Sequence, residues 1–394
     1  MKLLFISQVF PYPPYRDGAR LKVYNLIKCL SKYSEIYFIT FIEPKEKEYV
    51  DKIQQFCEKI VFVQYEDKGI KRIFKFIHDA LSPKRFQSFL MKNEIDIAVK
   101  EWNPDVVHVD LPLMSQYYAQ LKNIPKVIAS HDVISLYAYK NFKASRNILR
   151  KIMWFCLYKQ RINIERNCYP KFDVCTVVSN EDKEFLQKHC PNLHVKVIPN
   201  GVDVEYFNIE KKVKIDIASI GLFGGMDFYP NEDASIYFIN DIFPLVKKKI
   251  PEVKLYLVGR NPTERLVNFV KNEKDVIMTG EVGDIREYYK KVSVIVSPIR
   301  LGSGIKNTVL QAMAMSKAIV ATNQAVKAID AENGKDVLIA DEPEQFAENV
   351  IKLLNNQELK NELEKNARKL VVDKYSWKAH AEKFQKIYSD IRLK

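Results

Sequence analysis

Short runs of apolar residues, many of them β-branched, alternate along the chain with segments whose apolar positions recur at helical spacing. Runs that are apolar at almost every position are typical of strands buried on both faces of a parallel sheet. The pattern therefore predicts an α/β fold whose first strands lie at 2–7, 35–41, 59–64, 105–109, 126–130, 173–178 and 194–198. A second series of strands is expected at 215–221, 253–258, 276–279, 292–297, 318–322 and 336–340.

The two series predict two Rossmann-like, doubly wound parallel-sheet domains in tandem. The turn Pro199-Asn200-Gly201 and a charged, weakly periodic segment separate them. We therefore expect a first domain over 1–200, a linker over 201–214 and a second domain over 215–374. Helical periodicity continues at 343–355, 358–372 and 377–391. Because open parallel sheets bind ligands outside the carboxyl ends of their strands, the two domains are expected to face a cleft that holds the active site.

The composition is typical of a soluble globular protein. The chain has 394 residues, of which 47% are apolar and 28% are charged, unlike a disordered chain. No run approaches the roughly 18 apolar residues that span a bilayer, and Met1 leads into a strand pattern without a signal-peptide layout. We therefore expect a cytoplasmic protein. The six cysteines form no Cys-x-x-Cys pair, so neither a structural zinc nor a disulfide framework is expected.

The positive charge is concentrated in the first half of the chain. The net charge is +13, with 32 Lys and Arg against 21 Asp and Glu over 1–200, and 30 against 28 over 201–394. This asymmetry favours an anionic partner for the first half, such as a phospholipid surface, a phosphorylated substrate or nucleic acid. The alternative is a general gain in solubility.

Two segments carry much of this positive charge. Residues 68–92 hold seven Lys and Arg with one acidic residue, and 140–171 hold nine with one, both interleaved with aromatic and aliphatic residues. A basic helix with an aromatic face is typical of an element that lies on a membrane surface. Alternatively, the apolar positions pack on the sheet while the lysines face water. Nucleic acid is disfavoured as a partner, because no nucleic-acid-binding motif accompanies the charge.

The loop within 298–322 is the most informative segment for chemistry. Gly302 and Gly304 precede Lys306, which falls in the first turn of an expected helix. Glycines let the backbone approach a phosphate, N–H groups at the helix start point at it, and the lysine adds a positive charge. We interpret the loop as a diphosphate cradle, with a simple tight turn as the alternative. It matches neither a P-loop nor a Gly-x-Gly-x-x-Gly fingerprint, which disfavours ATP hydrolysis and NAD chemistry.

The segment 298–322 resembles the signature of the GT-B-fold retaining glycosyltransferases of family 4, also called glycosyl transferases group 1. The family pattern Gly-x-Lys-x-x-x-Leu-Glu-Ala-Met-Ala-x-Gly-x-x-Val-Val-Ala-Thr is matched at most positions. Four further resemblances occur in the expected order. They are the cleft histidine at 130–132, the interdomain junction at 197–203, a loop of one bacterial sugar-transferase branch at 223–231, and the start of the final helix at 375–377.

The resemblance implies a role for each domain and a set of site residues. The first domain would lie on the acceptor side, with 375–394 as a helix packing back on it, and the second would bind the nucleotide sugar. Gly18 and Arg20 would approach the donor phosphates, and His131 would be catalytic through its contact with the transferring sugar. In the second domain, the residues implied at the donor are Gly224, Arg300, Gly302, Ser303, Gly304, Ile305, Lys306 and Gln311. Of these, Lys306 would also be catalytic.

Three of these site residues have structural alternatives, and one further histidine is expected to be structural. His131 could be a packed histidine, and Arg20 could cap a helix surface. Arg300 could instead form a structural ion pair. His108 lies inside an apolar run and is expected to be a core residue.

The chain also departs from the family pattern. Two glutamates spaced eight apart in the family fall at Ser303 and Gln311, and neither residue is acidic. The second glutamate normally accepts hydrogen bonds from the ribose hydroxyls, so Gln311 keeps a carbonyl acceptor but loses the charge. Ala19 replaces a glycine in the first loop. An Arg/Lys pair of the second domain is absent from 221–231, which leaves Arg300 and Lys306 as the cationic candidates for the diphosphate.

The sequence favours a bacterial-type hexosyl glycosyltransferase that builds a surface polysaccharide, lipopolysaccharide or glycolipid. The resemblance implies transfer from a nucleotide sugar to a saccharide or lipid-linked acceptor, with retained configuration and with the leaving phosphate taking the acceptor proton. No metal-ligand spacing stands out, so neither a metal nor a cofactor is expected. The alternatives are a catalytically weak GT-B binding or scaffold protein, and a protein that binds anionic membrane surfaces. Transfer to a lipid-linked acceptor and binding to an anionic membrane would both be consistent with a peripheral position on the inner face of the cytoplasmic membrane.

Overall fold

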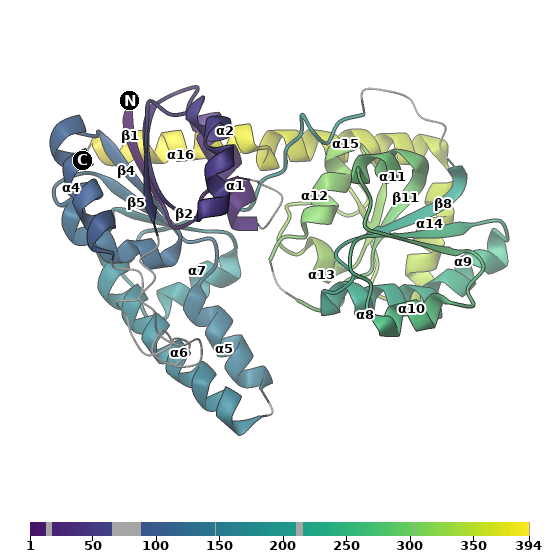
Figure 1. Ribbon diagram of the computed structural model, residues 1–394. Coiled ribbons are helices and arrows are strands. Elements are labelled where there is room, and N and C mark those ends of the chain that lie inside the picture. The colour runs from purple at the N-terminus through teal and green to yellow at the C-terminus, as the bar shows by residue number, and fades with distance from the viewer. Residues whose placement is uncertain (13–17, 65–87, 146, 210–215, 303, 394) are drawn as a thin grey trace. The chain divides into compact units, whose positions relative to one another are not determined.

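The computed structural model describes the whole chain except residues 13–17, 65–87, 146, 210–215, 303 and 394 (Figure 1). The contacts divide the chain into two compact units. Unit 1 comprises Met1–Pro199 together with His380–Lys394, and unit 2 comprises Asn200–Ala379. The chain therefore passes from unit 1 into unit 2 and then returns to unit 1.

Unit 1 is built on a seven-stranded parallel sheet with the order β3-β2-β1-β4-β5-β6-β7. Its strands are β1 (Lys2–Ser7), β2 (Glu35–Ile42), β3 (Lys59–Gln64), β4 (Val106–Asp110), β5 (Lys126–Ala129), β6 (Val174–Val177) and β7 (Val195–Val197). Every residue of the central strand β4 is buried, as expected for a parallel sheet covered on both faces. The strands predicted from the first series of apolar runs are confirmed.

Helices and 3-10 turns connect the strands of unit 1. They are α1 (Gly18–Leu30), η2 (Pro44–Tyr49), α2 (Asp51–Gln54), α4 (Phe89–Trp102), η3 (Pro112–Leu121), α5 (Ile134–Ala144), α6 (Ile148–Cys168), η4 (Tyr169–Lys171), α7 (Asn180–Gln187) and α16 (Trp377–Arg392). Side-chain caps explain where several of them begin. Ser88, Asn147 and Ser179 accept hydrogen bonds from first-turn N–H groups of α4, α6 and α7.

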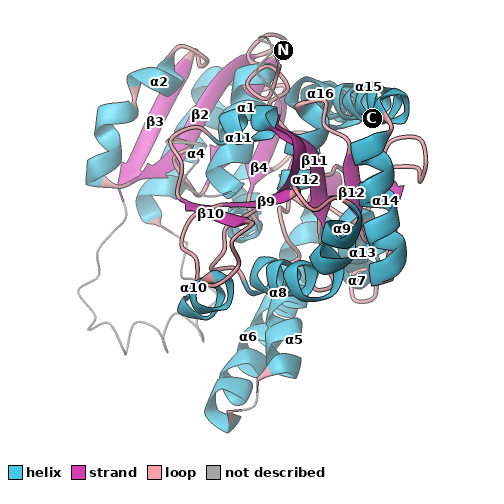
Figure 2. Cartoon of the chain, turned by 90° about the vertical axis from the view of Figure 1, so that its right-hand side faces the viewer, coloured by secondary structure: helices cyan, strands magenta, loops and turns pink. Residues whose placement is uncertain are grey.

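Unit 2 is built on a six-stranded parallel sheet with the order β10-β9-β8-β11-β12-β13, whose strands are magenta in Figure 2. The strands are β8 (Asp216–Phe223), β9 (Lys254–Val258), β10 (Val276–Gly280), β11 (Val292–Ser297), β12 (Ile319–Ala321) and β13 (Leu338–Ile339). All residues of β11, at the centre of the sheet, are buried. The second series of predicted strands is therefore also confirmed.

The helices of unit 2 alternate with its strands. They are α8 (Tyr229–Tyr237), the π-helical turn η5 (Phe238–Ile242), α9 (Phe243–Lys249), α10 (Glu264–Val270), α11 (Ile285–Lys291), α12 (Asn307–Ala314), α13 (Asn323–Val326), α14 (Pro343–Asn355) and α15 (Gln357–Tyr375). Side chains of Thr263, Asp284 and Asn356 cap α10, α11 and α15.

Helix α16 completes an apolar core of unit 1. Phe384 and Tyr388 of α16 belong to the same buried cluster as Leu3 and Phe5 of β1. Tyr375, at the end of α15, is instead buried in a core of unit 2. The chain therefore changes units within a few residues, between the end of α15 and the first turn of α16.

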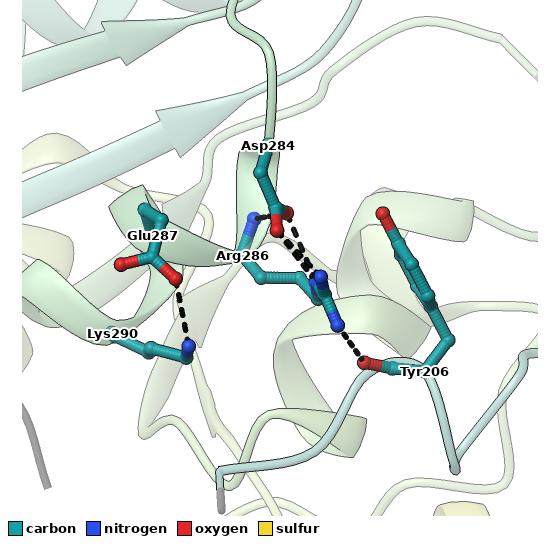
Figure 3. A network of polar contacts seen from close by, with 5 residues as sticks. All are labelled: Tyr206, Asp284, Arg286, Glu287 and Lys290. Carbon is teal, nitrogen blue, oxygen red and sulfur yellow. Dashed lines mark hydrogen bonds and ion pairs between the residues drawn. The ribbon is translucent and has the colours of Figure 1, made fainter. Parts of the chain in front are cut away.

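The beginning of the expected linker is packed on unit 2. Phe207 is buried in a core of that unit. The Arg286 guanidinium pairs with Asp284, donates to the Tyr206 carbonyl at 3.1 Å and lies 4.0 Å from the centre of the Tyr206 ring (Figure 3). These contacts fix the chain just before residues 210–214, the part of the expected linker that lies outside the described residues.

Candidate active site

The carboxyl ends of β4 and β5 bring a histidine and a carboxylate together in unit 1. Asp110 ends β4 and pairs in register with Ala129, the last residue of β5, and His131 follows two residues later. Nε2 of His131 lies 2.9 Å from Oδ1 of Asp110, and both side chains are buried. His131 therefore lies at the end of the sheet where parallel-sheet proteins bind ligands.

His108 lies near the same carboxylate oxygen. Its Nε2 is 3.6 Å from Oδ1 of Asp110, and its Nδ1 is 2.7 Å from the hydroxyl of Tyr388 in α16. The ring is fully buried and stacks on Phe5 at 4.3 Å between ring centroids. His108 is therefore a core residue, as expected from its place in an apolar run.

Asp110 is ionised within this buried cluster. Burial alone would raise the pKa of its carboxyl, but the adjacent His131 and His108 hold that pKa well below its usual value. Oδ2 of Asp110 is also buried and has no hydrogen-bond partner among the described residues. Leaving a buried carboxylate oxygen unpaired is unfavourable, so Oδ2 adds to the energetic cost of burying Asp110.

Lys22 of α1 adds a buried amine to the cluster. The residue is 3% exposed; burial lowers its pKa, whereas nearby Asp110 and Asp132 act to raise it. Neither Lys22 nor Asp110 was predicted from the sequence. One signal existed for Lys22, which shares the buried stripe of α1 with Leu26 and Leu30 at a spacing of four.

Helix α1 begins at Gly18, and residues 13–17 of the loop before it lie outside the described residues. A Cβ at Gly18 would meet no atom within 4 Å. Arg20 is buried, lies 2.8 Å from Oε1 of Glu46 and donates to the carbonyl of Phe10. These contacts engage the guanidinium within unit 1, which favours a structural role for Arg20 over a contact with phosphate.

In unit 2, the loop between β11 and α12 holds the predicted diphosphate cradle. Gly302 has φ of 99° and Gly304 has φ of 72°, both in the left-handed region that favours glycine. A Cβ at Gly302 would lie 3.2 Å from Nζ of Lys306, so the lysine ammonium lies close to the glycine backbone. Ile305 is half-buried, whereas Ser303 lies outside the described residues.

Lys306 stands at the N-terminus of α12. It occupies the N-cap position, and its side chain does not cap the helix. Lys306 is half-buried, and this burial lowers its pKa. The lysine and the N–H groups of the first helical turn thus lie at the same end of α12, the arrangement that favours an anion.

Gln311, one turn further along α12, already has a protein partner for its acceptor oxygen. The Tyr289 hydroxyl donates to Oε1 of Gln311 at 3.3 Å and to the Thr308 carbonyl at 3.2 Å. Tyr289 is fully buried, which raises its pKa, and it stacks on Phe223 with 3.9 Å between ring centroids. A ribose hydroxyl at Gln311 would therefore share this oxygen with a tyrosine held firmly by packing.

Arg300 forms the ion pair that the sequence left as its alternative role. Its guanidinium donates to both carboxylate oxygens of Asp233, at distances of 2.9 to 3.2 Å. It also lies 4.0 Å from the centre of the Tyr237 ring. These contacts favour a structural role for Arg300 and leave Lys306 as the cation best placed at the glycine loop.

Gly224 lies where the loops after β8 and β9 meet. Its N–H donates to the Val258 carbonyl at 3.1 Å. A Cβ at Gly259 would lie 1.6 Å from the Gly224 carbonyl oxygen, so no larger residue fits there without displacing the loop. Gly259 was not predicted from the sequence. The backbones of the two loops therefore touch at the carboxyl end of the unit 2 sheet.

The described residues contain neither a candidate metal cluster nor a membrane-spanning helix. No group of three or more His, Cys, Asp or Glu side chains in this part of the chain could hold a metal ion. No helix among the same residues is long and apolar enough to cross a membrane.

Two parallel-sheet units, one of them with a glycine and lysine loop at the start of a helix, define the architecture of a GT-B glycosyltransferase. Residues 17–206 match the family described as Glycosyltransferase Family 4, and residues 218–356 match Glycosyl transferases group 1. The chain therefore belongs to this glycosyltransferase family, as its motifs predicted.

Of the relatives with similar sequences, some extend over nearly the whole chain and others over about half of it. An uncharacterized 44.6 kDa protein in the cps region of Klebsiella pneumoniae is 24% identical over 96% of this chain and 97% of its own. The uncharacterized glycosyltransferase MJ1178 of Methanocaldococcus jannaschii is 25% identical over 96% of each chain. The capsular polysaccharide biosynthesis glycosyltransferase CapM of Staphylococcus aureus is 24% identical over 48% of this chain and 53% of its own.

Solved structures show the same fold. Sucrose-phosphate synthase from Thermosynechococcus elongatus superimposes with a TM-score of 0.71 and 16% identity over all of both chains. Alr3699/HepE of Anabaena, solved in complex with UDP, gives a TM-score of 0.67 and 14% identity over 99% of this chain and 100% of its own. The GT-B fold expected from the sequence is confirmed.

Proposed function

We propose that this glycosyltransferase moves a hexose from a nucleotide-sugar donor to a hydroxyl of a saccharide or lipid-linked acceptor, with retention of anomeric configuration. The observation that carries the proposal is the loop in which Gly302 and Gly304 adopt left-handed backbone conformations and Lys306 begins α12. In this loop a bound diphosphate would meet both backbone N–H groups and a cation. The complexes of Alr3699/HepE with UDP and with UDP-glucose support this class of donor.

In the proposed reaction, the acceptor oxygen bonds to the anomeric carbon while the bond from that carbon to the diphosphate oxygen breaks. The acceptor proton passes to the leaving phosphate, so no protein nucleophile and no metal or other cofactor takes part. Lys306 offsets the charge that develops on the diphosphate. His131 contacts a sugar hydroxyl, and Asp110 holds the histidine ring in place.

A specific observation favours a second candidate, a catalytically weak GT-B protein that binds nucleotide sugars. The family's ribose-binding glutamate is Gln311 here, and its acceptor oxygen is engaged by Tyr289. Arg300 is engaged by Asp233. The first contact occupies a neutral acceptor where the family has a charged one, and the second engages a guanidinium that could otherwise meet a donor.

A ligand screen followed by a transfer assay tests the proposal. We expect one of UDP, GDP, ADP or TDP to raise the melting temperature, because a ligand that binds only the folded state stabilises it. Lys306→Ala should weaken the binding of that nucleoside diphosphate by about 1.5–3 kcal/mol, the scale of a charged hydrogen bond. Lys327→Ala, which removes an exposed lysine after α13, is the matched control and should bind normally.

The activity measurement separates the candidates. Hydrolysis or transfer of the matching nucleotide sugar supports the transferase, and analysis of the product's anomeric configuration tests retention. Nucleotide binding without turnover would favour the weakly active binding protein. If no nucleotide binds, or if Lys306→Ala binds as tightly as the unmodified chain, the donor-site assignment is wrong.

We also propose where the reaction takes place. A lipid-linked acceptor would place the protein at the inner face of the cytoplasmic membrane as a peripheral protein. The basic character of the first 200 residues supports this position, since the cytoplasmic leaflet is anionic. Neither a metal nor nucleic acid is part of the proposal.

A further inference from the structure

Helices α5 and α6 form a helical hairpin that extends beyond the sheet of unit 1 (Figures 1 and 2). The buried residues of α5 are Ser135, Leu136 and Ala138, near its start, and those of α6 are Ile164, Glu165 and Cys168, near its end. Among the described residues, the far part of the hairpin, from the end of α5 through the first half of α6, thus contributes none to a core of unit 1. We call this part the hairpin tip.

The base of the hairpin is firmly held, so its tip has a fixed direction. Oε1 of Glu165 accepts a hydrogen bond from the backbone N–H of Ser135 at 3.1 Å, and Oε2 of Glu165 accepts one from the Ser135 hydroxyl at 2.5 Å. Nε2 of His189 lies 2.6 Å from the same carboxylate. Aromatic pairs join the helices further out, with Tyr137 and Trp154 at 5.7 Å and Phe142 and Phe155 at 5.5 Å between ring centroids.

The tip exposes a continuous apolar face on α6. Ile148 is 67% exposed, Leu149 74%, Ile152 55% and Phe155 42%. Residues 148, 152 and 155 follow the i, i+4, i+7 spacing of a single helix face. Single exposed apolar residues are common, but a group of four on one face marks an interaction surface.

Positive charge surrounds this apolar face. Residues 133–164 contain seven Lys and Arg and no Asp or Glu. Nζ of Lys151 lies 5.6 Å from the centre of the Phe142 ring, and Nζ of Lys159 lies 5.5 Å from that of Phe155. The ammonium groups therefore flank the aromatic residues of the tip.

These charges do not stabilise the helix that carries them. Arg150 and Lys151 lie in the first turn of α6, where the helix dipole disfavours positive charge, and no acidic residue offsets them there. A second copy of the same tip would bring like charges together. Charge complementarity therefore favours an anionic partner with an apolar layer, which describes the surface of a bilayer containing anionic phospholipids.

We propose that the hairpin tip docks on an anionic membrane surface. Ile148, Leu149, Ile152 and Phe155 enter the headgroup region, while the flanking Arg150 and Lys151 contact lipid phosphates. Of the two basic segments singled out in the sequence, 140–171 covers the end of α5 and all of α6, whereas 68–87 of the other lie outside the described residues, as does Arg146. Docking on the membrane does not require sugar transfer, so a vesicle-binding experiment tests it independently of the proposed reaction.

Sedimentation of the full chain with lipid vesicles tests the proposal. We expect binding to vesicles of phosphatidylcholine mixed with phosphatidylglycerol, little binding to phosphatidylcholine alone, and a decline as salt increases. Ile148→Ser/Leu149→Ser/Ile152→Ser and Arg150→Glu/Lys151→Glu should each reduce binding at least about tenfold. The control, Lys248→Glu/Lys249→Glu on α9 of unit 2, changes net charge equally at two exposed lysines and should bind within about twofold of the unmodified chain.

Circular dichroism and melting temperatures of each variant show whether it has folded, and a less drastic pair, Ile148→Ser with Leu149→Ser, replaces the triple variant if that one does not fold. Three results would overturn the proposal: equal binding to both kinds of vesicle, no binding at low salt, or an equal loss in the control. A concentration-dependent dimer that the serine variants dissociate, together with absent vesicle binding, would assign the tip to a second copy of the chain instead.

Discussion

Nε2 of His131 lies 2.9 Å from Oδ1 of Asp110, so a histidine after β5 is fixed by a carboxylate at the end of β4. Because the pKa of Asp110 is held low, its carboxylate accepts a hydrogen bond, and the proton on the ring belongs on Nε2. The pair therefore sets both the orientation and the tautomer of His131.

Asp110→Asn should lower kcat by about 10–100-fold with a smaller change in KM, because a neutral amide no longer orients His131 and its tautomer. Steady-state kinetics with the donor identified by the ligand screen would measure this. The matched control is Tyr388→Phe, which removes the contact to His108 and leaves the His131 contact intact. An equal fall in kcat for both variants would assign the effect to a disturbed core.

Lys22→Met should weaken turnover without weakening the fold. The buried ammonium carries a desolvation penalty, so a methionine of similar shape should leave the melting temperature of unit 1 unchanged or raised. Loss of the positive charge near Asp110 and Asp132 should lower kcat/KM about tenfold. Lys28→Met, which removes a lysine near the end of the same helix, serves as the control. If Lys22→Met lowers the melting temperature and leaves kcat/KM unchanged, Lys22 has only a structural role.

Gln311→Glu should tighten binding of the preferred nucleoside diphosphate by about three- to tenfold, because a carboxylate accepts hydrogen bonds from ribose hydroxyls more strongly than an amide does. The Tyr289 hydroxyl can still donate to the new carboxylate. Isothermal calorimetry would measure the change. Gln357→Glu, at the exposed first residue of α15, introduces the same charge outside α12 and should have no effect. Weaker binding by Gln311→Glu alone would mean that this site is adapted to the amide.

Lys317 provides a stability prediction for unit 2. It is buried, and burial lowers its pKa to about 8 from 10.5, although Glu364 acts against the shift. Below about pH 8 the buried lysine is charged in the folded state, and its desolvation lowers the free energy of unfolding by the full amount. The free energy of unfolding rises between about pH 8 and pH 10.5, the pKa of the unfolded lysine, because the unfolded state then binds more protons. Lys317→Met should therefore raise the free energy of unfolding by about 1–2 kcal/mol near neutral pH.

Urea unfolding at about pH 7 and about pH 9.5 measures this difference, which should shrink at the higher pH. Lys327→Met, at an exposed position nearby in the chain, should show no difference at either pH. An advantage for Lys317→Met that stays constant with pH would indicate better packing and not removal of a buried charge.

The strands and the glycine loop could be predicted because their signals are local. Continuous apolar runs mark buried parallel strands, and two glycines before a lysine at a helix start mark a phosphate loop. The contacts of Arg20 with Glu46 and of Arg300 with Asp233 join residues far apart in the sequence. These contacts depend on the path of the connecting loops, which no local sequence pattern specifies. The sequence could therefore offer a structural role for each arginine as an alternative, but it could not decide between that role and a contact with phosphate.

The partnership of Asp110 with His131 was missed for a related reason. Its geometry follows from the register that pairs Asp110 with Ala129, and apolar runs predict that two strands exist without fixing how far one is shifted along the other. Lys22 was missed because a charged residue on an apolar helix stripe is readily taken for a solvated one. In both cases a polar side chain, the Asp110 carboxylate or the Lys22 amine, lies in a segment whose other buried positions are mostly apolar.

The return of the chain to unit 1 also determines the order in which the protein can fold during synthesis. A ribosome completes all of unit 2 before it makes His380 and the residues after it, although unit 1 began first. Until Phe384 and Tyr388 emerge, Leu3 and Phe5 lack two of the side chains that bury them. Unit 2 can therefore fold on the nascent chain while unit 1 still exposes an apolar face, and this is the stage at which the growing chain is most prone to aggregate or to recruit a chaperone.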